Sequence, residues 1–268
     1  MKLHVVTGLP RSGSTLLCNI LNQNPKFWST STSALSNLLS VVSHTLANSP
    51  EVKGLLQCNR EQTEHRMKAA AQAFVKEWHS IHDREIVFDK SRSWTHNSLL
   101  LNSLYPDAKM LVTVRDLRSV FGSCEKQHRK NPILDEAKDL NSKTLYSRAD
   151  TMFSPDGLIG GPIVGIQDIL NRKVDVFFVK YEDFAADPTL IMSRVYGYLG
   201  EENFEHDFEN VENTAKDPDY LYMHKYPHKG EGKVAMVDKD EWKTYFSQDI
   251  ADIIMQRFKD FNTYFGYR

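Results

Sequence analysis

The stretch LHVVTGLPRSGSTLL, residues 3–17, decides the fold of this chain. Residues 3–7 form a short apolar run with β-branched side chains, which is typical of a buried strand, and the run ends at Gly8. After Ser14, leucine and isoleucine side chains recur at helical spacing. The stretch therefore predicts a strand, a glycine-containing loop and an amphipathic helix over residues 14–21.

The loop between this strand and helix has the composition of an anion site. Gly8, Gly13 and Ser14 let the backbone turn sharply and point successive N–H groups at one anion, and the helix start adds the positive end of its dipole. A triphosphate-binding loop, GxxxxGK[ST], has a lysine where this chain has Ser14. The loop predicts a phosphate or sulfate site of another kind. The alternative is a strand-to-helix turn that binds no ligand.

The composition is that of one ordinary globular domain. Of 268 residues, 41% are hydrophobic and 25% are charged, and no linker or repeat divides the chain, so we expect a single domain over residues 1–268. A formal net charge of −2 gives no electrostatic reason to expect nucleic acid as a partner. The first apolar run is too short for a signal peptide or membrane anchor, so we expect a cytoplasmic protein without stable membrane insertion.

The cysteines and histidines do not show the spacing of a metal site or a disulfide framework. Cys18, Cys58 and Cys124 are odd in number and scattered, without CxxC spacing. The ten histidines show no HExxH pattern. We therefore expect thiols in a reducing compartment and no metal.

Apolar runs alternate with helical patterns along the rest of the chain. Further strands are predicted at residues 85–89, 108–116 and 174–183, and further helices at residues 60–82, 95–106, 117–130 and 187–199. The first of these helices is expected to turn a stripe toward the core, formed by Met67, Ala70, Ala71, Phe74 and Trp78. Residues 29–36 and 131–160 are expected to be polar and irregular. The alternation predicts an α/β fold, a single domain with a central parallel sheet flanked by helices, as in P-loop NTPases.

Four polar side chains stand at the points where the predicted strands end. They are Arg11, Lys90, Arg115 and Tyr181. Because ligands of parallel α/β sheets bind at the carboxyl ends of the strands, we expect these side chains to form one site. Three of them also have a purely structural alternative: an ion pair of Arg115 or Lys90 with the neighbouring aspartate, or a core position for Tyr181.

Four motifs in register resemble those of the sulfotransferase family. GLPRSGSTLL, residues 8–17, resembles the family's 5′-phosphosulfate loop, and VTVRDLRSVFGSCEK, residues 112–126, resembles its 3′-phosphate strand and helix. FDKSRSW, residues 88–94, is similar to the segment with the family's strand-end lysine. VKYEDFAADPTLIMSRVYGYLG, residues 179–200, is similar to the family's YED segment. A looser match, HKGEGKV at 228–234, resembles the family's C-terminal basic-glycine loop.

The resemblance implies an activity and a set of contacts. Members of the family move a sulfuryl group from 3′-phosphoadenosine 5′-phosphosulfate (PAPS) to a hydroxyl or amine and leave 3′-phosphoadenosine 5′-phosphate (PAP), without a metal. Lys90 would then act at the bridging oxygen of the leaving phosphate, with Arg11 as a second catalytic cation. The implied cofactor contacts are Arg11, Ser12, Gly13, Ser14 and Thr15 on the 5′ side, Arg115 and Ser123 on the 3′-phosphate, Tyr181 near the adenine, and Lys229 with Gly230 closing over the 3′-phosphate.

The chain departs from the family pattern at the general base. Cytosolic members have a histidine two residues after the strand-end lysine, where this chain has Arg92. Other branches have a glutamate soon after the first helix, whereas this chain has no carboxylate there until Glu51. The base is unresolved, and its candidates are Glu125, His128, Glu61, Glu64, His65 and His96. Arg92 is a candidate to bind an acidic acceptor.

Two other functions are compatible with the residues. A P-loop kinase or NTPase would use Asp89 or Asp116 for Mg²⁺, but this chain lacks its loop lysine. A protein that had lost its base would bind PAP or PAPS without catalysis. We expect a small-molecule, lipid or saccharide acceptor, in a pocket shaped by residues 27–60 and 131–160. The lack of an anchor favours a microbial or viral cytoplasmic enzyme.

Overall fold

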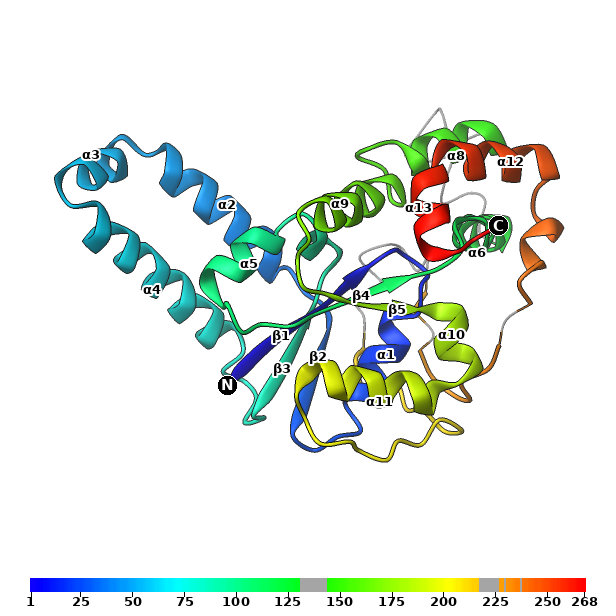
Figure 1. The fold of residues 1–268 in the computed structure, drawn as a ribbon, viewed down its shortest axis with the longest axis horizontal. Coiled ribbons are helices and arrows are strands. Elements are labelled where there is room, and N and C mark those ends of the chain that lie inside the picture. Colours follow the sequence, from blue (N-terminus) through cyan, green and yellow to red (C-terminus); the bar gives the residue numbers. More distant parts are fainter. Residues whose placement is uncertain (131–143, 217–226, 229, 237) are drawn as a thin grey trace.

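A parallel sheet forms the centre of the computed structural model, which describes residues 1–130, 144–216, 227–228, 230–236 and 238–268 (Figure 1). In chain order its five strands are β1 (Lys2–Gly8), β2 (Phe27–Thr32), β3 (Ile86–Lys90), β4 (Met110–Val114) and β5 (Phe177–Lys180), and their spatial order is β2-β3-β1-β4-β5. All neighbouring strands pair in parallel, so their carboxyl ends lie at one edge. The predicted α/β fold is confirmed.

Helices cover both faces of the sheet (Figure 1). On one face, α1 (Ser14–Leu21) and α11 (Pro188–Leu199) pack over Val6. The opposite face packs its core around Val5, under α5 (Ser98–Leu104), α6 (Leu117–Lys130), α9 (Gly160–Asn171), α12 (Gln248–Arg257) and α13 (Lys259–Phe265). Val5 and Val6 point to opposite faces, because successive side chains of a strand alternate, and both are fully buried. The apolar run of β1 is therefore the signature of a strand covered on both sides.

Several predicted helix boundaries are confirmed by the structure. The helices predicted at residues 14–21 and 117–130 are α1 and α6. α11 begins after Asp187, whose side chain accepts a hydrogen bond from the Leu190 amide at 2.9 Å, and it ends at Gly200, which has a φ of 72°. The helix predicted at residues 95–106 is split into the 3₁₀ turn η1 (Arg92–Thr95) and α5.

Three expectations about irregular segments and strand length are wrong. Residues 29–36 are not a loop, because their first part belongs to the edge strand β2, where threonine suits the pleated backbone. Within residues 131–160, α8 (Leu145–Phe153) is a helix whose start is stabilised by a capping box between Thr144 and Ser147. The strand predicted at 174–183 is shorter, because the chain turns into α10 (Tyr181–Ala186) directly after β5.

A helical arm of α2 (Leu35–Asn48), α3 (Pro50–Cys58) and α4 (Arg60–Trp78) projects away from the sheet (Figure 1). The core stripe predicted on α4 is wrong: Phe74 and Trp78 are each 39% exposed, and the buried residues of α4 are Thr63 and Val75. The reason is that α4 packs along α2 and α3, and meets the body near α5. Helical periodicity identified the helix but not the surface against which it packs.

Candidate functional site

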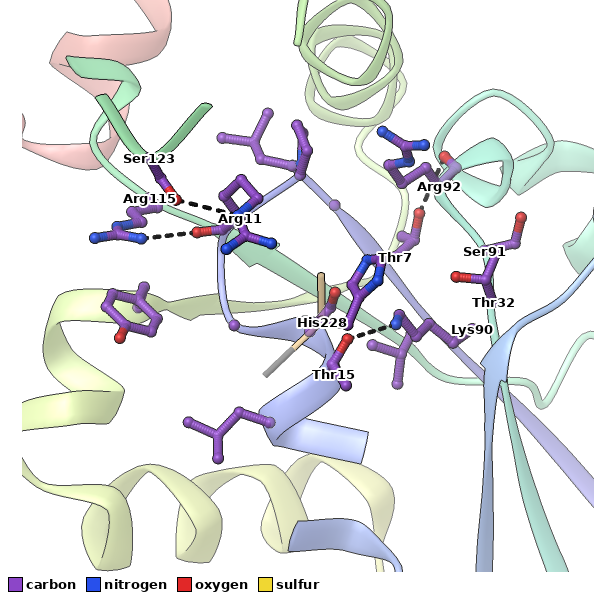
Figure 2. A pocket seen from close by; sticks show the side chains of 18 of the residues that line it. Thr7, Arg11, Thr15, Thr32, Lys90, Ser91, Arg92, Arg115, Ser123 and His228 are labelled. Carbon is purple, nitrogen blue, oxygen red and sulfur yellow. Dashed lines mark hydrogen bonds between the residues drawn. The ribbon is translucent and has the colours of Figure 1, made fainter. Parts of the chain in front are cut away.

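A cavity of about 270 Å³ lies at the carboxyl ends of the strands (Figure 2). Every strand contributes to its lining, either by its last residues or by the residue that follows. The residues predicted from the sequence that line it are Arg11, Gly13, Ser14, Thr15, Lys90, Arg115, Ser123 and Tyr181. The parallel sheet therefore brings these predicted residues together, although Arg11 and Tyr181 lie far apart in the sequence.

The loop after β1 has a backbone that requires glycine at two points. Gly8 has a φ of 128°, and a β-carbon there would lie 2.1 Å from the carbonyl oxygen of Thr113 on β4. Gly13 has a φ of 85° and precedes α1 as its N-cap residue without a side-chain cap. The amides of the first turn of α1 therefore receive no hydrogen bond acceptor from the Gly13 side chain, and they are suited to hold an anion.

Two further residues shape this loop from within. Arg11 has a φ of 58°, an unusual backbone conformation for a residue other than glycine. Ser12 is buried, and its hydroxyl lies 2.6 Å from both the Leu9 carbonyl oxygen and Thr113 Oγ1. The Ser12 hydroxyl thus bonds within the protein, which leaves its backbone amide as the group that could contact a ligand. The predicted cofactor contact of Ser12 stays a prediction.

Lys90 reaches across the cavity to the first turn of α1. Its Nζ donates a hydrogen bond of 2.7 Å to Thr15 Oγ1, and its backbone amide donates to Thr30 Oγ1 of β2 at 2.9 Å. The Lys90 side chain is buried at 7% exposure, so its charge acts in a region from which most water is excluded. An ammonium and the amides of α1 therefore face the same space.

A second cationic group surrounds the start of α6. Arg115 donates from NH1 to the Arg11 carbonyl oxygen at 2.9 Å, and Arg11 Nε donates to Ser123 Oγ at 3.1 Å (Figure 2). The Arg115 guanidinium lies 4.4 Å from the centroid of the Tyr181 ring. The Arg11 side chain thus lies with Ser123, whereas the sequence assigned it to the 5′ side. The contact of Arg11 with the 5′ side of the donor stays a prediction, and it requires the Arg11 side chain to turn away from Ser123.

The structural alternatives given for Arg115, Lys90 and Tyr181 differ from the contacts that these residues make in the structure. Asp116 pairs with Arg118 at 2.6 Å rather than with Arg115, and this hydrogen-bonded contact raises the pKa of Arg118. Asp89 accepts a hydrogen bond from Trp94 Nε1 at 2.7 Å, while its neighbour Lys90 bonds to Thr15. Tyr181 lines the cavity instead of a core.

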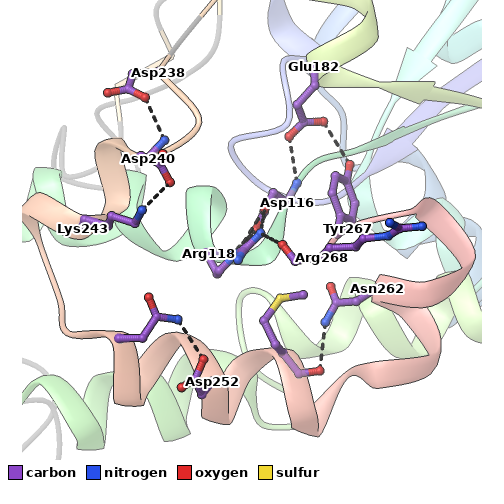
Figure 3. A network of polar contacts seen from close by, with 12 residues as sticks. Asp116, Arg118, Glu182, Asp238, Asp240, Lys243, Asp252, Asn262, Tyr267 and Arg268 are labelled. Atoms are coloured by element: carbon purple, nitrogen blue, oxygen red, sulfur yellow. Dashed lines mark hydrogen bonds and ion pairs between the residues drawn. The ribbon is translucent and has the colours of Figure 1, made fainter.

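The Glu182 carboxylate links the segment that follows β5 to the segment that follows β4 (Figure 3). Glu182 accepts a hydrogen bond from the Asp116 amide and another from the Tyr267 hydroxyl, both at 3.0 Å. Burial, together with the negative charge of Glu182, raises the pKa of Tyr267, so its hydroxyl remains a donor. Because Glu182 follows Tyr181 and Asp116 follows Arg115, the hydrogen bond from the Asp116 amide to Glu182 helps to position the Arg115 guanidinium beside the Tyr181 ring.

None of the predicted candidates for the base lines the cavity in the described part of the chain. Glu125 is fully buried and forms a two-pronged ion pair with Arg148, at 2.8 and 2.6 Å. His96 is exposed after η1, and His128 lies near the end of α6. On α4, the exposed candidates are Glu61, Glu64 and His65. A role for any of them as base stays a prediction.

The C-terminal motif is described only in part. Lys229 lies outside the described residues, and Gly230 is buried against α1, where a β-carbon would lie 2.9 Å from the Leu16 amide nitrogen. Its neighbour His228 lines the cavity, although the sequence analysis did not select it. Arg92, Thr32 and Ser91 also line the cavity. The sequence feature that could have identified His228 was its position in the basic-glycine motif HKGEGKV.

The described ranges contain no cluster of three or more histidine, cysteine, aspartate or glutamate side chains arranged as metal ligands. The cysteines form no disulfide. No helix among the same residues combines the length and the hydropathy that a membrane span requires. The prominent charged groups among the described lining residues are cationic side chains: Arg11, Lys90, Arg92 and Arg115.

The chain matches a protein-family model over most of its length. A sequence model of the sulfotransferase family matches residues 5–206, a span that includes the glycine loop, Lys90, Arg115 and Tyr181. A comparison with curated proteins gives no significant match.

Solved structures share the fold at low sequence identity. The sulfotransferase domain of the Synechococcus PCC 7002 olefin synthase is 20% identical with a TM-score of 0.55, covering 92% of this chain and 88% of that domain. The sulfotransferase domain from the curacin biosynthetic pathway is 13% identical with a TM-score of 0.51, covering 95% and 98%. Mouse sulfotransferase SULT7A1, complexed with PAP, is 14% identical with a TM-score of 0.52, covering 97% and 82%. At these identities the likeness shows the fold.

Proposed function

The chain belongs to the sulfotransferase family, and we propose that it transfers a sulfuryl group from PAPS to a hydroxyl or amine of its acceptor and releases PAP. The observation that supports this most directly is the hydrogen bond from Lys90 Nζ to Thr15 Oγ1. It places a buried ammonium beside the uncapped first turn of α1. A phosphosulfate in this space would meet a cation from one side and backbone amides from the other.

A second anion of the same donor would bind at the start of α6. Arg115 and Ser123 both line the cavity, and Arg115 is positioned by its contact with Tyr181. A guanidinium and a hydroxyl suit a terminal phosphate, because they donate several hydrogen bonds to its oxygens. The aromatic ring of Tyr181 gives the adenine a surface for stacking. Two cationic groups in one cavity therefore fit a nucleotide with separate 5′ and 3′ anions.

The chemistry that this site supplies is stabilisation of the leaving group. In the transfer, the bond between the sulfur and the bridging oxygen breaks, and negative charge develops on the 5′-phosphate of PAP. Lys90 and the amides of α1 are fixed before the reaction begins, so they lower the energy of this charge without rearrangement. Removing a single donor of this kind lowers kcat by about 10²–10³-fold.

The kinase or NTPase alternative has less support from the geometry. It requires a carboxylate at a strand end to hold Mg²⁺. Asp89 is fully buried and bonded to Trp94, and Asp116 is paired with Arg118, so neither lines the cavity. Ser14 also takes the position of the missing loop lysine.

A thermal-shift experiment separates the two classes of enzyme. We expect PAP without magnesium to raise the melting temperature, because a ligand that binds only the folded state stabilises it, and ATP with magnesium to have little effect. The reverse pattern would contradict the proposal. Adenosine 5′-phosphosulfate serves as the matched ligand that lacks the 3′-phosphate.

Transfer itself is tested with PAPS carrying a ³⁵S-labelled sulfuryl group. The acceptor panel contains phenols, aliphatic alcohols, amines, saccharides and lipids, and labelled products are separated from labelled sulfate. Label on an acceptor supports the enzyme. Binding of PAP with no transfer to any acceptor would instead identify a PAP-binding protein without catalysis.

A further inference from the structure

We propose that His228 is the proton acceptor that activates the acceptor's hydroxyl, an inference that rests on the proposed sulfuryl transfer. His228 lines the cavity together with Lys90 and Thr15, and Figure 2 shows its imidazole ring among these side chains. Imidazole is the group that most often serves as general base near neutral pH. The chain thus has an imidazole in the cavity although Arg92 replaces the histidine that follows the strand-end lysine in cytosolic relatives.

The other described residues of the cavity are poor alternatives for this role. Its charged groups are the cations Arg11, Lys90, Arg92 and Arg115, and neither aspartate nor glutamate is among the described lining residues. Lys90 is committed as a donor to Thr15. Tyr181 lies against Arg115, in the part of the site assigned to the adenine and 3′-phosphate. The remaining polar side chains are hydroxyls, which are themselves weak bases.

The backbone on both sides of His228 is attached to the donor site. The Pro227 carbonyl oxygen accepts a hydrogen bond of 3.1 Å from Arg11 NH1. The Gly230 carbonyl oxygen accepts one of 2.6 Å from Asn19 Nδ2. Asn19 is 1% exposed, and its Oδ1 also accepts from the Ala215 amide at 2.8 Å. The side chain of Asn19 on α1 therefore fixes the segment that presents the imidazole.

Gly230 makes this attachment possible by its lack of a side chain. A β-carbon at this position would lie 2.9 Å from Asn19 Nδ2, the Leu16 amide nitrogen and Thr15 Cγ2 alike. The chain can therefore pack directly on the first turn of α1, close to Thr15 and the Lys90 ammonium. His228 is two residues away, which is consistent with its ring lying in the same cavity.

The proton transfer completes the reaction. The acceptor oxygen forms a bond with sulfur while the bond from sulfur to the bridging oxygen breaks, and that oxygen retains the electron pair as part of PAP. The hydroxyl proton passes to a ring nitrogen of neutral His228, which becomes imidazolium and later releases the proton to water. Lys90 offsets the charge on the leaving phosphate, so the two side chains act at opposite ends of the moving sulfuryl group.

The test compares His228→Gln with the control variant Arg172→Gln, which changes an exposed side chain at the end of α9. We use the acceptor that the wild-type enzyme sulfates best in the labelled-PAPS assay. His228→Gln should lower kcat by about 10²-fold or more, while PAP affinity changes less than about threefold. Arg172→Gln should leave both unchanged. The wild-type kcat/KM should fall as the pH is lowered, because imidazolium cannot accept a proton, and His228→Gln should abolish this decrease.

A series of substituted phenols separates a proton acceptor from a positioning residue. Phenols that are already ionised at the assay pH need no base, so the loss in His228→Gln should shrink as the phenol becomes more acidic. The same loss for all phenols would overturn the proposal. So would loss of PAP affinity with unchanged kcat, since His228 would then be a phosphate ligand.

A measurement on the wild-type protein does not depend on the variant's folding. In ring-labelled wild-type protein, the His228 NMR signals, assigned through bonds from the backbone resonances, should shift when PAP is added. A His228 ring signal that is insensitive to saturating PAP would overturn its placement in the cavity. A wild-type protein that binds PAP yet sulfates nothing contradicts the proposed function itself, and the assigned role with it.

Discussion

The guanidinium of Arg115 lies 4.4 Å from the ring centroid of Tyr181, and one edge of the same ring lies against Gly13. A β-carbon on Gly13 would come within 2.7 Å of Tyr181 Cδ2. Three strand ends thus meet at one aromatic ring. The arrangement links the glycine loop to Arg115, so the two proposed anion sites keep a fixed spacing.

Arg115→Ala should weaken PAP binding much more than the binding of adenosine 5′-phosphosulfate. Removing charge-assisted hydrogen bonds costs about 1.5–3 kcal/mol, roughly 10- to 150-fold in affinity, and only PAP has the phosphate that Arg115 is proposed to bind. Isothermal titration of both ligands measures the difference. Arg172→Ala, which removes an exposed arginine at the end of α9, is the control. Equal losses for both ligands would show that Arg115 does not recognise the 3′-phosphate.

Lys90→Ala should reduce turnover more than it reduces PAP affinity. The ammonium acts on charge that develops only as the sulfur–oxygen bond breaks, so kcat should fall by about 10²–10³-fold. Steady-state transfer from labelled PAPS, together with PAP titration, measures the two effects. Lys109→Ala removes a surface lysine that pairs with Asp175 and should leave both nearly unchanged. A Lys90 variant impaired in affinity alone would have no place in the chemical step.

Gly8→Ala and Gly197→Ala should change the free energy of unfolding in opposite directions. At Gly8, a β-carbon would lie 2.1 Å from a backbone oxygen of β4, so we expect a loss of about 1–3 kcal/mol or more. At Gly197, inside α11, nothing lies within 4 Å of the added carbon, so alanine should stabilise the helix by about 0.5–1 kcal/mol. Urea unfolding measures both. A tolerated Gly8→Ala would show that β1 and β4 can separate at this point.

Glu125→Gln should destabilise the fold while the folded enzyme retains its turnover. Glu125 is buried in an ion pair with Arg148, and breaking a buried ion pair by removing one partner costs about 3–5 kcal/mol. The double variant Glu125→Met with Arg148→Met should recover much of this stability. Urea unfolding and kcat per folded molecule are the two readouts. Lost turnover at unchanged stability would return Glu125 to the role of base.

Stability should fall as the pH is lowered from about 6.5 toward 4. Burial, together with the charges of Lys2 and Lys109, lowers the pKa of His4 to about 4, and burial lowers that of His206 to about 4. In this window the unfolded chain binds protons that the native protein does not, so each histidine should contribute a slope of about 1.4 kcal/mol per pH unit. The Nδ1 atom of His4 accepts a hydrogen bond from the Lys109 amide at 2.9 Å, which requires a ring unprotonated at that nitrogen.

The variant His4→Asn tests the origin of that slope. Asparagine can still accept the hydrogen bond from Lys109 but does not titrate, so the free energy of unfolding should depend less steeply on pH between about 6.5 and 4. His44→Asn changes an exposed histidine and should leave the slope as in wild type. Urea unfolding at several pH values decides this. An undiminished slope in His4→Asn would assign the effect to other groups.

Local patterns in the sequence were sufficient for much of the fold and for the cations that line the cavity. The apolar run of β1, the glycines after it and the cap residues of α11 each act over a few residues, so their periodicity and turn chemistry could be read directly. Parallel pairing then places strand ends together, which brought Lys90 and Arg115 to one edge. The edge strand β2 was missed because serine and threonine are common in both strands and loops.

The sequence by itself determined the class of fold, the anion loop and the cations at the strand ends. Only the tertiary structure decided which surfaces the arm leaves exposed, that Glu125 is neutralised by Arg148, and that His228 lies by the loop around Arg11. The physical reason is range. Helix and strand preferences arise between neighbours, whereas burial, ion pairing and the lining of a cavity depend on residues that are far apart in the sequence and that only the tertiary fold brings together.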